Sequence, residues 1–357
     1  MTISEHSASR GFSPGPSAAP VGDYADLRRQ IRAAGLLEPA LGYYGAMLAL
    51  VACLWAAGFA LIALWPGPGD VLAIFVLALT MVQAGFVGHD AGHNQVFDKT
   101  RHNRVLGLLT MTLFLGTSFD FWTSKHNRHH SRTNEPGEDP DITGQFFAFT
   151  PEQAAERKGV MAWIARNQGT LFFALTTMAT IGFRVDAWQK SLGNLDKARS
   201  RQELAALLVN FVLWFVIPSV VFGPLHWLLL FLVVHMVVGV YMTSVFAPNH
   251  KGMPLVVGKR PSFLVQQVVT SRNVHGPGAI GGFVVDFLYG GLNYQIEHHL
   301  FPTMARNNMG ACELLVRPFC AKAGLPHLEM GVIASYRQLL GSLNATGRGE
   351  EPVVIRG

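Results

Sequence analysis

The sequence predicts an all-α integral membrane protein with four transmembrane helices in two hairpins, accompanying interfacial helices and a cytoplasmic helical cap. Of its 357 residues, 50% are hydrophobic and only 14% are charged, a balance that is unusual for a soluble protein. Six apolar runs approach the roughly 20 residues that a helix needs to cross a bilayer. They occupy residues 44–65, 71–88, 105–122, 169–185, 204–222 and 225–247.

The positions of the basic residues define the expected topology. No Lys or Arg occurs at residues 33–98 or 202–250, although the chain has 28 of them. Each of these windows contains two apolar runs joined by a short turn, PGPGD in the first and GPLH in the second. Because basic residues concentrate on the cytoplasmic side of membrane proteins, both turns are expected to face outward. The expected spans are residues 44–65, 71–88, 204–222 and 225–247.

The two remaining apolar runs, at residues 105–122 and 169–185, are flanked by basic residues at both ends. A crossing would carry one basic group to the outer side, so both runs are expected to lie along the membrane interface. Both termini are then cytoplasmic. We therefore expect an integral, multi-pass protein of the cell (inner) membrane.

The chain is expected to have one main domain, at residues 39–330, between an N-terminal tail (1–38) and a C-terminal tail (331–357). The N-terminal tail is expected to be disordered or amphipathic, because residues 1–23 are polar and lack the apolar stretch of a secretory signal. The three cysteines share no CxxC spacing and so indicate no thiolate metal site. The net charge of +5 is not gathered in a basic cluster with interleaved aromatics, so no nucleic-acid partner is expected.

Seven histidines gather in three short stretches of this half-hydrophobic chain. HDAGH places two histidines four residues apart and HNRHH places three within five residues, so that on a helix each set projects from nearly one face. QIEHH adds two more, with Gln295 at the position that a third histidine would take. All three stretches fall on the cytoplasmic side of the expected topology. The seven are His89, His93, His126, His129, His130, His298 and His299.

A metal site explains this concentration better than isolated surface histidines do. Clustered imidazoles suffer desolvation or charge repulsion unless something that they bind offsets it. A structural zinc is satisfied by four ligands, so seven imidazoles indicate two metal ions, and imidazole suits iron, copper, nickel or zinc. His275 is ambiguous. Ordinary hydrogen-bonded surface positions are expected for His6, His102, His226, His235 and His327.

The ordered stretches HDAGH, HNRHH and QIEHHLFP, with four spanning helices in two hairpins, resemble the membrane fatty acid desaturases over about residues 40–325. Gln295 in place of a histidine resembles the front-end branch, although bacterial relatives with that last stretch include enzymes of other regioselectivity. The resemblance implies a non-haem di-iron centre, with two iron ions held by the seven histidines. It also implies that Gln295 is a ligand or near-ligand.

Other residues receive roles from the same resemblance. The family tends to place one more ligand after the last spanning helix, where APNHKG offers His250 as a ligand and Asn249 as a ligand through water. The EPGEDPD segment after HNRHH either supplies partners for the imidazoles or is a turn-rich loop. No substrate-binding residue is assigned. Four polar side chains near the histidines have two open roles: they either orient imidazole N–H groups or simply solvate helix ends. They are Asp90, Asn94, Asn127 and Glu297.

The implied reaction is the O2-dependent introduction of a cis double bond into an acyl chain carried on coenzyme A or on a membrane lipid. Side-chain acid–base chemistry does not remove hydrogens from unactivated methylene groups, so metal, dioxygen and external electrons are required. No His-Pro-Gly-Gly signature of a fused haem domain occurs, and GPGAIG at residues 276–281 favours a Gly-rich turn over a dinucleotide site. No bound haem, flavin or NAD is therefore expected. The electron donor is expected to be a separate ferredoxin or iron–sulfur flavoprotein reductase.

Three other functions are open on the sequence. A di-iron hydroxylase would return oxygen to the carbon instead of removing a second hydrogen. A membrane metal transporter would need its histidines near mid-membrane, whereas these lie beyond the expected helix ends. A catalytically silent lipid-binding relative would keep the scaffold without needing metal. The motifs determine neither the double-bond position nor the acyl carrier, although QIEHH favours front-end chemistry over a delta-nine activity.

Overall fold

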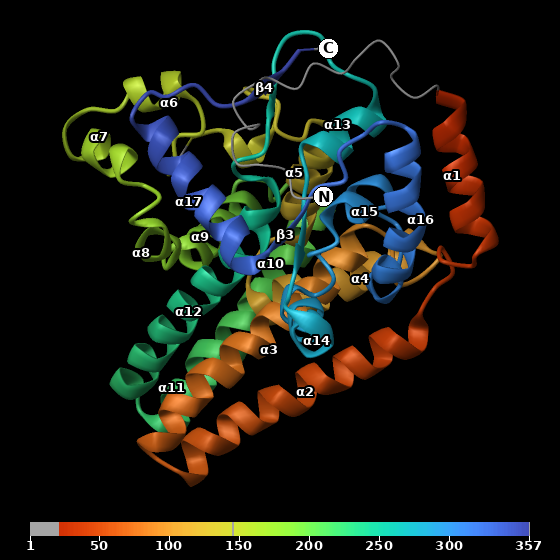
Figure 1. Cartoon of the computed structure of the whole chain (residues 1–357). Helices are drawn as coiled ribbons and strands as arrows, with labels where there is room; N and C mark the ends of the chain where they lie inside the picture. The colour runs from red at the N-terminus through yellow and green to blue at the C-terminus, as the bar shows by residue number, and fades with distance from the viewer. Residues whose placement is uncertain (1–20, 145, 357) are drawn as a thin grey trace.

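Four long apolar helical stretches form the lower part of the molecule in Figure 1, and shorter helices form a cap over one end of them. The structure is a computed structural model that describes residues 21–144 and 146–356. In these ranges, four helices are long and apolar enough to cross a membrane, as predicted. They are α2 (Leu41–Leu64), α3 (Pro68–Gly92), the stretch Ala198–Phe222 and α12 (Pro224–His250). The third comprises α10 (Ala198–Phe211), a π-helical segment (Val212–Val216) and α11 (Ile217–Phe222).

The predicted pairing into two hairpins is confirmed, since α2 packs on α3 and α11 packs on α12. Gly67 has φ +88° in the turn before α3, a conformation that residues with a Cβ rarely adopt. Pro68 then starts α3 at a position where no intrahelical N–H donor is needed. Gly223, with φ +90°, and Pro224 repeat this arrangement between α11 and α12. Glycine and proline thus define both turns.

The two hairpins pack together through α3, which contacts both α2 and α12. Leu77 and Met81 of α3 are fully buried, in one apolar cluster with Trp214 and Trp227 of the second hairpin. The indole N–H of Trp227 donates to the carbonyl oxygen of Trp214 at 2.8 Å, so this polar group is satisfied inside an apolar region. The hairpins therefore share a core that fixes the position of α3.

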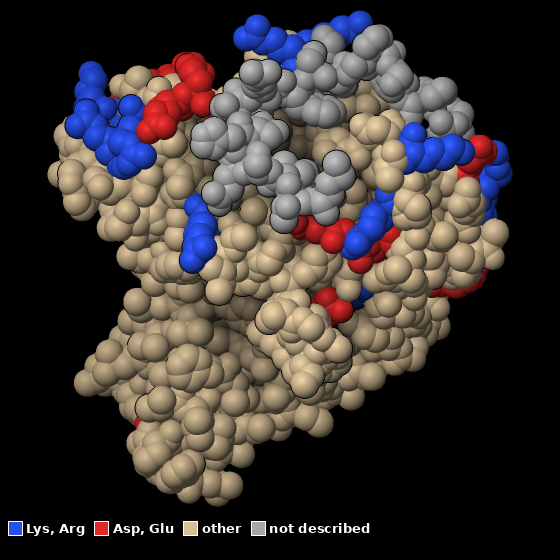
Figure 2. All heavy atoms as spheres, viewed as in Figure 1, with Lys and Arg blue, Asp and Glu red and all other residues tan. Residues whose placement is uncertain are grey.

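The outer surface of the hairpins is apolar. Figure 2 shows that Lys, Arg, Asp and Glu gather on the cap, whereas the visible surface of the hairpins is almost uncharged. Such a large exposed apolar surface is typical of a protein that contacts lipid. Large exposed apolar side chains of the hairpins include Leu64, Phe75, Val220 and Leu225.

The two apolar runs expected at the interface form broken helices. Residues 105–122 begin in α4 (Thr100–Gly107), continue through a π-helical segment (Leu108–Leu115) and turn at Gly116 into α5 (Phe119–Ser131). The direction changes by 109° at this turn, where Gly116 has φ +81°. Residues 169–185 are divided between α8 (Phe172–Thr176) and α9 (Ala179–Leu192). Their placement at a membrane interface stays a prediction.

The remaining elements complete the cap and its connections. Two pairs of short parallel strands join distant segments, β1 (Leu255–Val256) with β4 (Val354–Ile355) and β2 (Asn273–His275) with β3 (Glu329–Gly331). Short 3-10 segments occur at Pro140–Ile142 and Arg306–Asn308. The helices are α6 (Pro151–Ala155), α7 (Gly159–Arg166), α13 (Phe263–Val269), α14 (Gly278–Tyr289), α15 (Gln295–Leu300), α16 (Met309–Lys322) and α17 (Val332–Gly347).

Residues 331–356, within the stretch expected as a C-terminal tail, pack on other parts of the cap. They include α17, whose Leu339 and Leu343 are buried against Phe172 of α8. They also include β4, which pairs with β1 so that Leu255 lies opposite Val354. The expectation missed that apolar residues recur three to four positions apart in α17, the pattern of a helix with one buried face.

The N-terminal segment contributes one helix to the same layer. Helix α1 (Val21–Ala33) buries Leu27 and Ile31 in a cluster that includes Met309 and Val316 of α16. This part of the expected tail at residues 1–38 is therefore an amphipathic helix packed on the cap. Residues 1–20 of that expectation lie outside the described residues.

Candidate metal centre

Four helix ends meet under the cap and carry the histidines singled out in the sequence. His89 lies in the last turn of α3, and His93 caps its C-terminus. α5 carries the HNRHH histidines, α12 ends at His250, and α15 carries His298 and His299. Helix periodicity turns the histidines of each stretch toward a common side, and helix packing brings these sides together.

The first group combines all three histidine stretches. Possible ligand atoms of His89, His93, His126 and His298 all lie within 4.8 Å of one another. The ring centroids of His89 and His298 are 4.8 Å apart, and those of His93 and His126 are 4.9 Å apart. Trp122 stacks on His126 at 4.5 Å with an interplanar angle of 20°, which covers this half-buried imidazole. Four ring nitrogens at this spacing are able to surround one metal ion.

The second group combines His129, His250 and His299, whose possible ligand atoms also lie within 4.8 Å of one another. The Nε2 atoms of His129 and His250 are 3.4 Å apart. Gln295 reaches the group from α15, with its Nε2 atom 2.9 Å from Nε2 of His250. Asn249 lies behind it, since its Nδ2 atom donates to Oε1 of Gln295 at 3.0 Å. His250 and Gln295 therefore line the group, and Asn249 contacts it through Gln295.

His130 lies between the two groups. Its Nε2 atom is 3.1 Å from Nε2 of His126 and 3.2 Å from Nε2 of His298, both in the first group. Its ring also stacks on that of His299, in the second group, at a centroid distance of 4.1 Å. The two groups thus adjoin, and one side chain contacts both.

The unpaired ring nitrogens show that the site suits metal ions. Among the described residues, Nε2 of His89, His93 and His299 is buried without a hydrogen-bond partner. A buried polar atom without a partner is rare because its desolvation is uncompensated. Neutral imidazoles whose free nitrogens converge are the donor set that iron and other transition metals accept. The residues present therefore fit two metal ions.

The other ring nitrogen of several imidazoles is fixed by a hydrogen-bond partner. Nδ1 of His129 lies 3.0 Å from both carboxylate oxygens of Asp139. Nδ1 of His250 lies 3.0 Å from the carbonyl oxygen of Thr270, and Nδ1 of His299 lies 2.7 Å from Oε1 of Gln267. Such partners select the tautomer that leaves Nε2 free for a metal.

Asp90 lies within hydrogen-bond distance of His89, where it is able to take the orienting role that one of the two interpretations of the sequence gave it. Its Oδ1 atom is 3.0 Å from Nδ1 of His89, and its Oδ2 atom is 3.0 Å from Nε of Arg306. Arg306 is itself 3% exposed, so a buried cation balances this buried carboxylate. The arrangement orients His89 without adding a net charge.

The other three side chains proposed as orienting partners lie elsewhere. Asn94 accepts from Asn103 at 3.4 Å, and Asn127 is exposed. Glu297 is fully buried but faces away from both groups, where it accepts from Asn273 at 2.7 Å and lies 2.8 Å from Nε2 of His327. The sequence reasoning missed Gln267, Thr270 and Arg306, and it left Asp139 open within EPGEDPD. Of these four residues, only Asp139 was indicated by the sequence, because it is a carboxylate that closely follows HNRHH.

The electrostatics of the centre favour neutral imidazoles. Burial, and then the neighbouring imidazoles, lower the pKa of most of these side chains well below the usual histidine value. His129 differs, because burial lowers its pKa but the carboxylates of Asp139 and Asp141 outweigh burial and raise it. Neutral imidazole is the form that binds a metal. Outside the spanning helices, the histidines of the centre with a lowered pKa are His93, His126, His130, His298 and His299.

The remaining histidines lie outside both groups. His102 and His226 are exposed, as expected, whereas Nδ1 of His235 is 2.8 Å from the carbonyl oxygen of Phe231 inside the hairpins. His327 was expected at the surface, but its side chain is only 4% exposed and it contacts Glu297. His275 lies near Glu313 and Glu329. His6 is outside the described residues.

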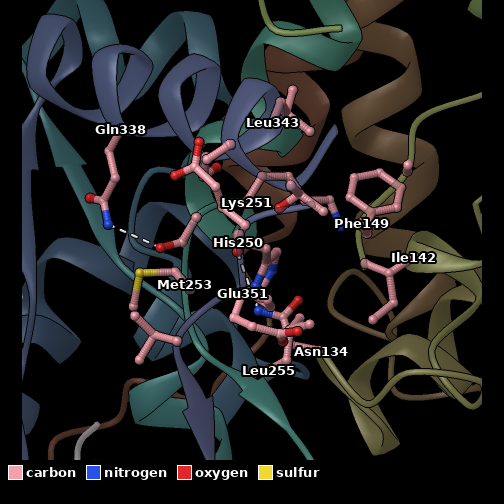
Figure 3. A pocket seen from close by; sticks show the side chains of 18 residues that line it. Asn134, Ile142, Phe149, His250, Lys251, Met253, Leu255, Gln338, Leu343 and Glu351 are labelled. Atoms are coloured by element: carbon pink, nitrogen blue, oxygen red, sulfur yellow. Dashed lines mark hydrogen bonds between the residues drawn. The ribbon is translucent and has the colours of Figure 1, made fainter. Parts of the chain in front are cut away.

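A cavity of about 260 Å³ lies beside the second group (Figure 3). His250 and Lys251 line one side, and apolar side chains such as Phe149 and Leu343 line another. Pockets that enclose a small organic ligand usually measure about 300–1,000 Å³. We therefore assign no substrate to this cavity.

Comparison with known proteins identifies the family to which this arrangement belongs. A family model described as fatty acid desaturase matches residues 67–331, which include all three histidine stretches and His250. The chain belongs to the fatty acid desaturase family. The resemblance noted in the sequence is thereby confirmed, and the histidine groups of this desaturase-family chain lie within the matched region.

Individual desaturases match most of the chain. An acyl-lipid (9-3)-desaturase of Physcomitrium patens is 30% identical over 337 residues, which cover 90% of this chain and 62% of the relative. A Delta(8)-fatty-acid desaturase of Euglena gracilis is 27% identical over 320 residues, covering 85% and 74%. A Delta(6)-fatty-acid desaturase of Caenorhabditis elegans is 31% identical over 275 residues, covering 71% and 59%. The chain thus spans less than two thirds of the length of the first and third relatives.

Proposed function

We propose that this chain is an O2-dependent fatty acyl desaturase that introduces a cis double bond into an acyl chain on coenzyme A or on a membrane lipid. It would use a non-haem di-iron centre and electrons from a separate protein. The observation that carries the proposal is the convergence of seven histidines in two adjoining groups, with His130 between them and free ring nitrogens among them. Membership of the desaturase family supports the same chemistry.

Each group would hold one iron ion. The first ion would be bound by His89, His93, His126 and His298, the second by His129, His250 and His299, with His130 available to either. Gln295 would bind or lie next to the second ion, since its side-chain amide lies 2.9 Å from Nε2 of His250. Asn249 would act through Gln295 or through a water.

When bound, a pair of iron ions supplied with dioxygen and two electrons provides an oxidant that removes one hydrogen from each of two adjacent methylene groups, while oxygen leaves as water. The protein would keep bulk water away, since seven of the eight histidines are at most 9% exposed. Asp139, Thr270 and Gln267 would keep the imidazoles correctly oriented throughout.

The charge distribution supports a cytoplasmic orientation of the cap and both termini. Basic residues are absent from residues 33–98 and 202–250 and occur in the other parts of the chain. The electron donor, a ferredoxin or an iron–sulfur flavoprotein reductase, would then dock on the charged cap from the cytoplasm of the cell. A metal transporter is disfavoured, because the histidines lie at the ends of α3 and α12 and not at their middles.

The test is fatty acid profiling of cells that express the parent, His129→Ala or His102→Ala together with a competent reductase, with double bonds located by mass spectrometry. His102 is exposed and lies outside both groups, so it serves as the matched control. A new unsaturated acid is expected with the parent and with His102→Ala, and not with His129→Ala.

Two results would contradict the proposal. An iron-loaded parent that changes no acyl chain would indicate a silent relative. A parent that makes only hydroxy acids would indicate a hydroxylase, in which oxygen returns to the carbon after the first hydrogen is removed. In either case mass spectrometry would find no new double bond in any acyl chain.

A further inference from the structure

A second cluster of histidines and carboxylates lies on the opposite side of α15 from the histidine centre. His275 ends β2, Glu329 begins β3, His327 precedes β3 by two residues, and Glu313 lies on α16. In the parallel pair, Asn273 lies opposite Glu329 and His275 opposite Gly331. Because alternate residues of a strand share a face, His275 lies on the same face as Asn273, and His327 and Glu329 follow the same spacing.

The distances in this cluster match those around a metal ion. Nε2 of His275 is 3.4 Å from Oε2 of Glu329 and 3.6 Å from Oε1 of Glu313. Nδ1 of His327 is 3.1 Å from Oε1 of Glu329. Zinc bonds to nitrogen and oxygen of about 2.0–2.2 Å in a tetrahedron place neighbouring ligand atoms roughly 3.3–3.5 Å apart. Ligand atoms of His275, Glu313 and Glu329 all lie within 4.8 Å of one another, and His327 adjoins this group through Glu329.

His327 provides an independent indication of a ligand. Its side chain is 4% exposed, and Nδ1 is buried and makes no hydrogen bond of normal geometry among the described residues, although Oε1 of Glu329 lies 3.1 Å away. Its other nitrogen, Nε2, lies 2.8 Å from Oε1 of Glu297, whose side chain is fully buried. A carboxylate that orients one imidazole nitrogen while the other faces a cation is the arrangement common to histidine ligands of zinc.

With both imidazoles neutral, the form that binds a metal, the charges in the cluster are suited to a cation. Glu297, Glu313 and Glu329 contribute three carboxylates, and the ion pairs of the described residues bring one guanidinium to them, that of Arg317. One divalent cation together with Arg317 would balance three negative charges. Arg317 is 53% exposed and lies on the open side of the cluster, so its guanidinium is able to move toward solvent while the buried groups stay in place.

We propose that His275, His327, Glu313 and Glu329 bind a zinc-type divalent cation, separate from the histidine centre. The set of two imidazoles and two carboxylates suits zinc, which accepts four nitrogen and oxygen ligands. The cation would join β2, β3 and α16, and through His327 and Glu297 it would brace α15, which carries His298 and His299. The site does not depend on the proposed desaturase chemistry.

The test uses the purified, iron-loaded full chain in detergent. The protein is equilibrated with zinc chloride and passed through a desalting column, and zinc and iron are then measured by mass spectrometry of the elements. The control is Glu350→Gln, at an exposed glutamate outside the cluster. We expect the parent and this control each to retain one more zinc ion per chain than Glu329→Gln and His275→Ala. All four proteins are expected to keep the same iron content.

Arg317→Gln tests the competition between guanidinium and zinc while leaving all four ligands intact. Removing this positive charge is expected to tighten zinc binding about tenfold. Zinc is also expected to raise the Tm of the parent and of Arg317→Gln, because a ligand that binds the folded state stabilises it, and to leave the Tm of Glu329→Gln unchanged.

The proposal is overturned if the iron-loaded parent and Arg317→Gln retain no zinc, or if Glu329→Gln retains as much zinc as Glu350→Gln. The cluster would then be an ion-pair network only. If the ligand variants do not fold, the zinc content of Arg317→Gln still tests the proposal, because this variant keeps all four ligands. Arg317→Gln protein that retains no zinc would overturn it. A parent that binds this one zinc ion but produces no unsaturated acid would contradict the desaturase proposal and leave the zinc site standing.

Discussion

The two histidine groups use the same residue type but are held in place differently. In the second group, each of His129, His250 and His299 has a hydrogen-bond partner at Nδ1. In the first group, among the described residues, only His89 has a partner other than a histidine, the carboxylate of Asp90. His93, His126 and His298 are held mainly by ring contacts with one another and with Trp122.

The difference follows from where the ligands come from in the chain. The first group lies where α3 packs on α5, with His298 reaching it from α15, so the positions of the helices fix the rings. The second group includes the end of α12 and depends on partners from the segments after α5 and α12. Helix packing thus positions one group, and hydrogen bonds from connecting segments position the other. The two groups should therefore respond differently to changes in their surroundings.

The largest effect is expected from the residue shared by both groups. His130→Ala removes the imidazole that contacts His126, His298 and His299. Replacing a residue that only supports a metal ligand typically lowers activity about 10- to 100-fold. We expect His130→Ala to lower activity by more than this and to release iron from both groups. Product analysis and iron content measure these outcomes. Retention of one full iron per chain would show that His130 serves one group alone.

Asp139→Asn should affect the second group selectively. The amide keeps the shape of the side chain but removes the negative charge beside His129. We expect metal affinity at the second group, and with it activity, to fall about 10- to 100-fold, while the first group keeps its metal. Iron titration followed by X-ray absorption would measure this. Glu138→Gln, at an exposed neighbour, is the matched control.

Gln267→Leu tests a neutral partner of the same group. It removes the acceptor at 2.7 Å and leaves the buried Nδ1 of His299 poorly satisfied, with only the hydroxyl of Thr133 at 3.4 Å. An unsatisfied buried donor costs about 1–3 kcal/mol, so we expect iron binding at the second group to weaken by about tenfold. This fall in affinity is smaller than the largest fall expected with Asp139→Asn. An unchanged iron affinity would mean that helix packing alone orients His299.

Trp122→Leu should give the smallest effect, because it removes packing and no hydrogen bond to an imidazole. Aromatic stacking contributes about 0.5–1.5 kcal/mol beyond burial, so we expect activity to fall about fivefold through His126. Trp163→Leu, at an exposed tryptophan of α7, is the control. A loss as large as that of Asp139→Asn would contradict the view that helix packing, more than this single ring contact, positions the first group.

Much of the fold was predictable because its signals are local. The absence of Lys and Arg from two long windows and the Gly-Pro turns predict four apolar helices in two hairpins, which the structure contains. The four- and three-residue spacings of HDAGH and HNRHH likewise predict histidines on shared helix faces. The packed C-terminal segment was missed, because no charge or turn signal marks Leu339 and Leu343 as buried against Phe172.

The partners of the histidines were less predictable, since they are far apart in the chain. Gln267 meets His299 across 32 positions, and Arg306 meets Asp90 across more than 200. Glu297 directly precedes His298 and His299 in the sequence, yet its helix turns it toward His327 instead. Such pairings depend on how the helices pack, which one sequence does not reveal.

The most direct test of the account is the iron content of the purified, reconstituted parent, measured per chain beside the Asp139→Asn variant at limiting iron. Two adjoining groups with unequal support predict two iron ions per parent chain and preferential loss of one ion from the variant. One iron ion per parent chain, or equal loss from both groups in Asp139→Asn, would contradict a centre built from two separately supported halves.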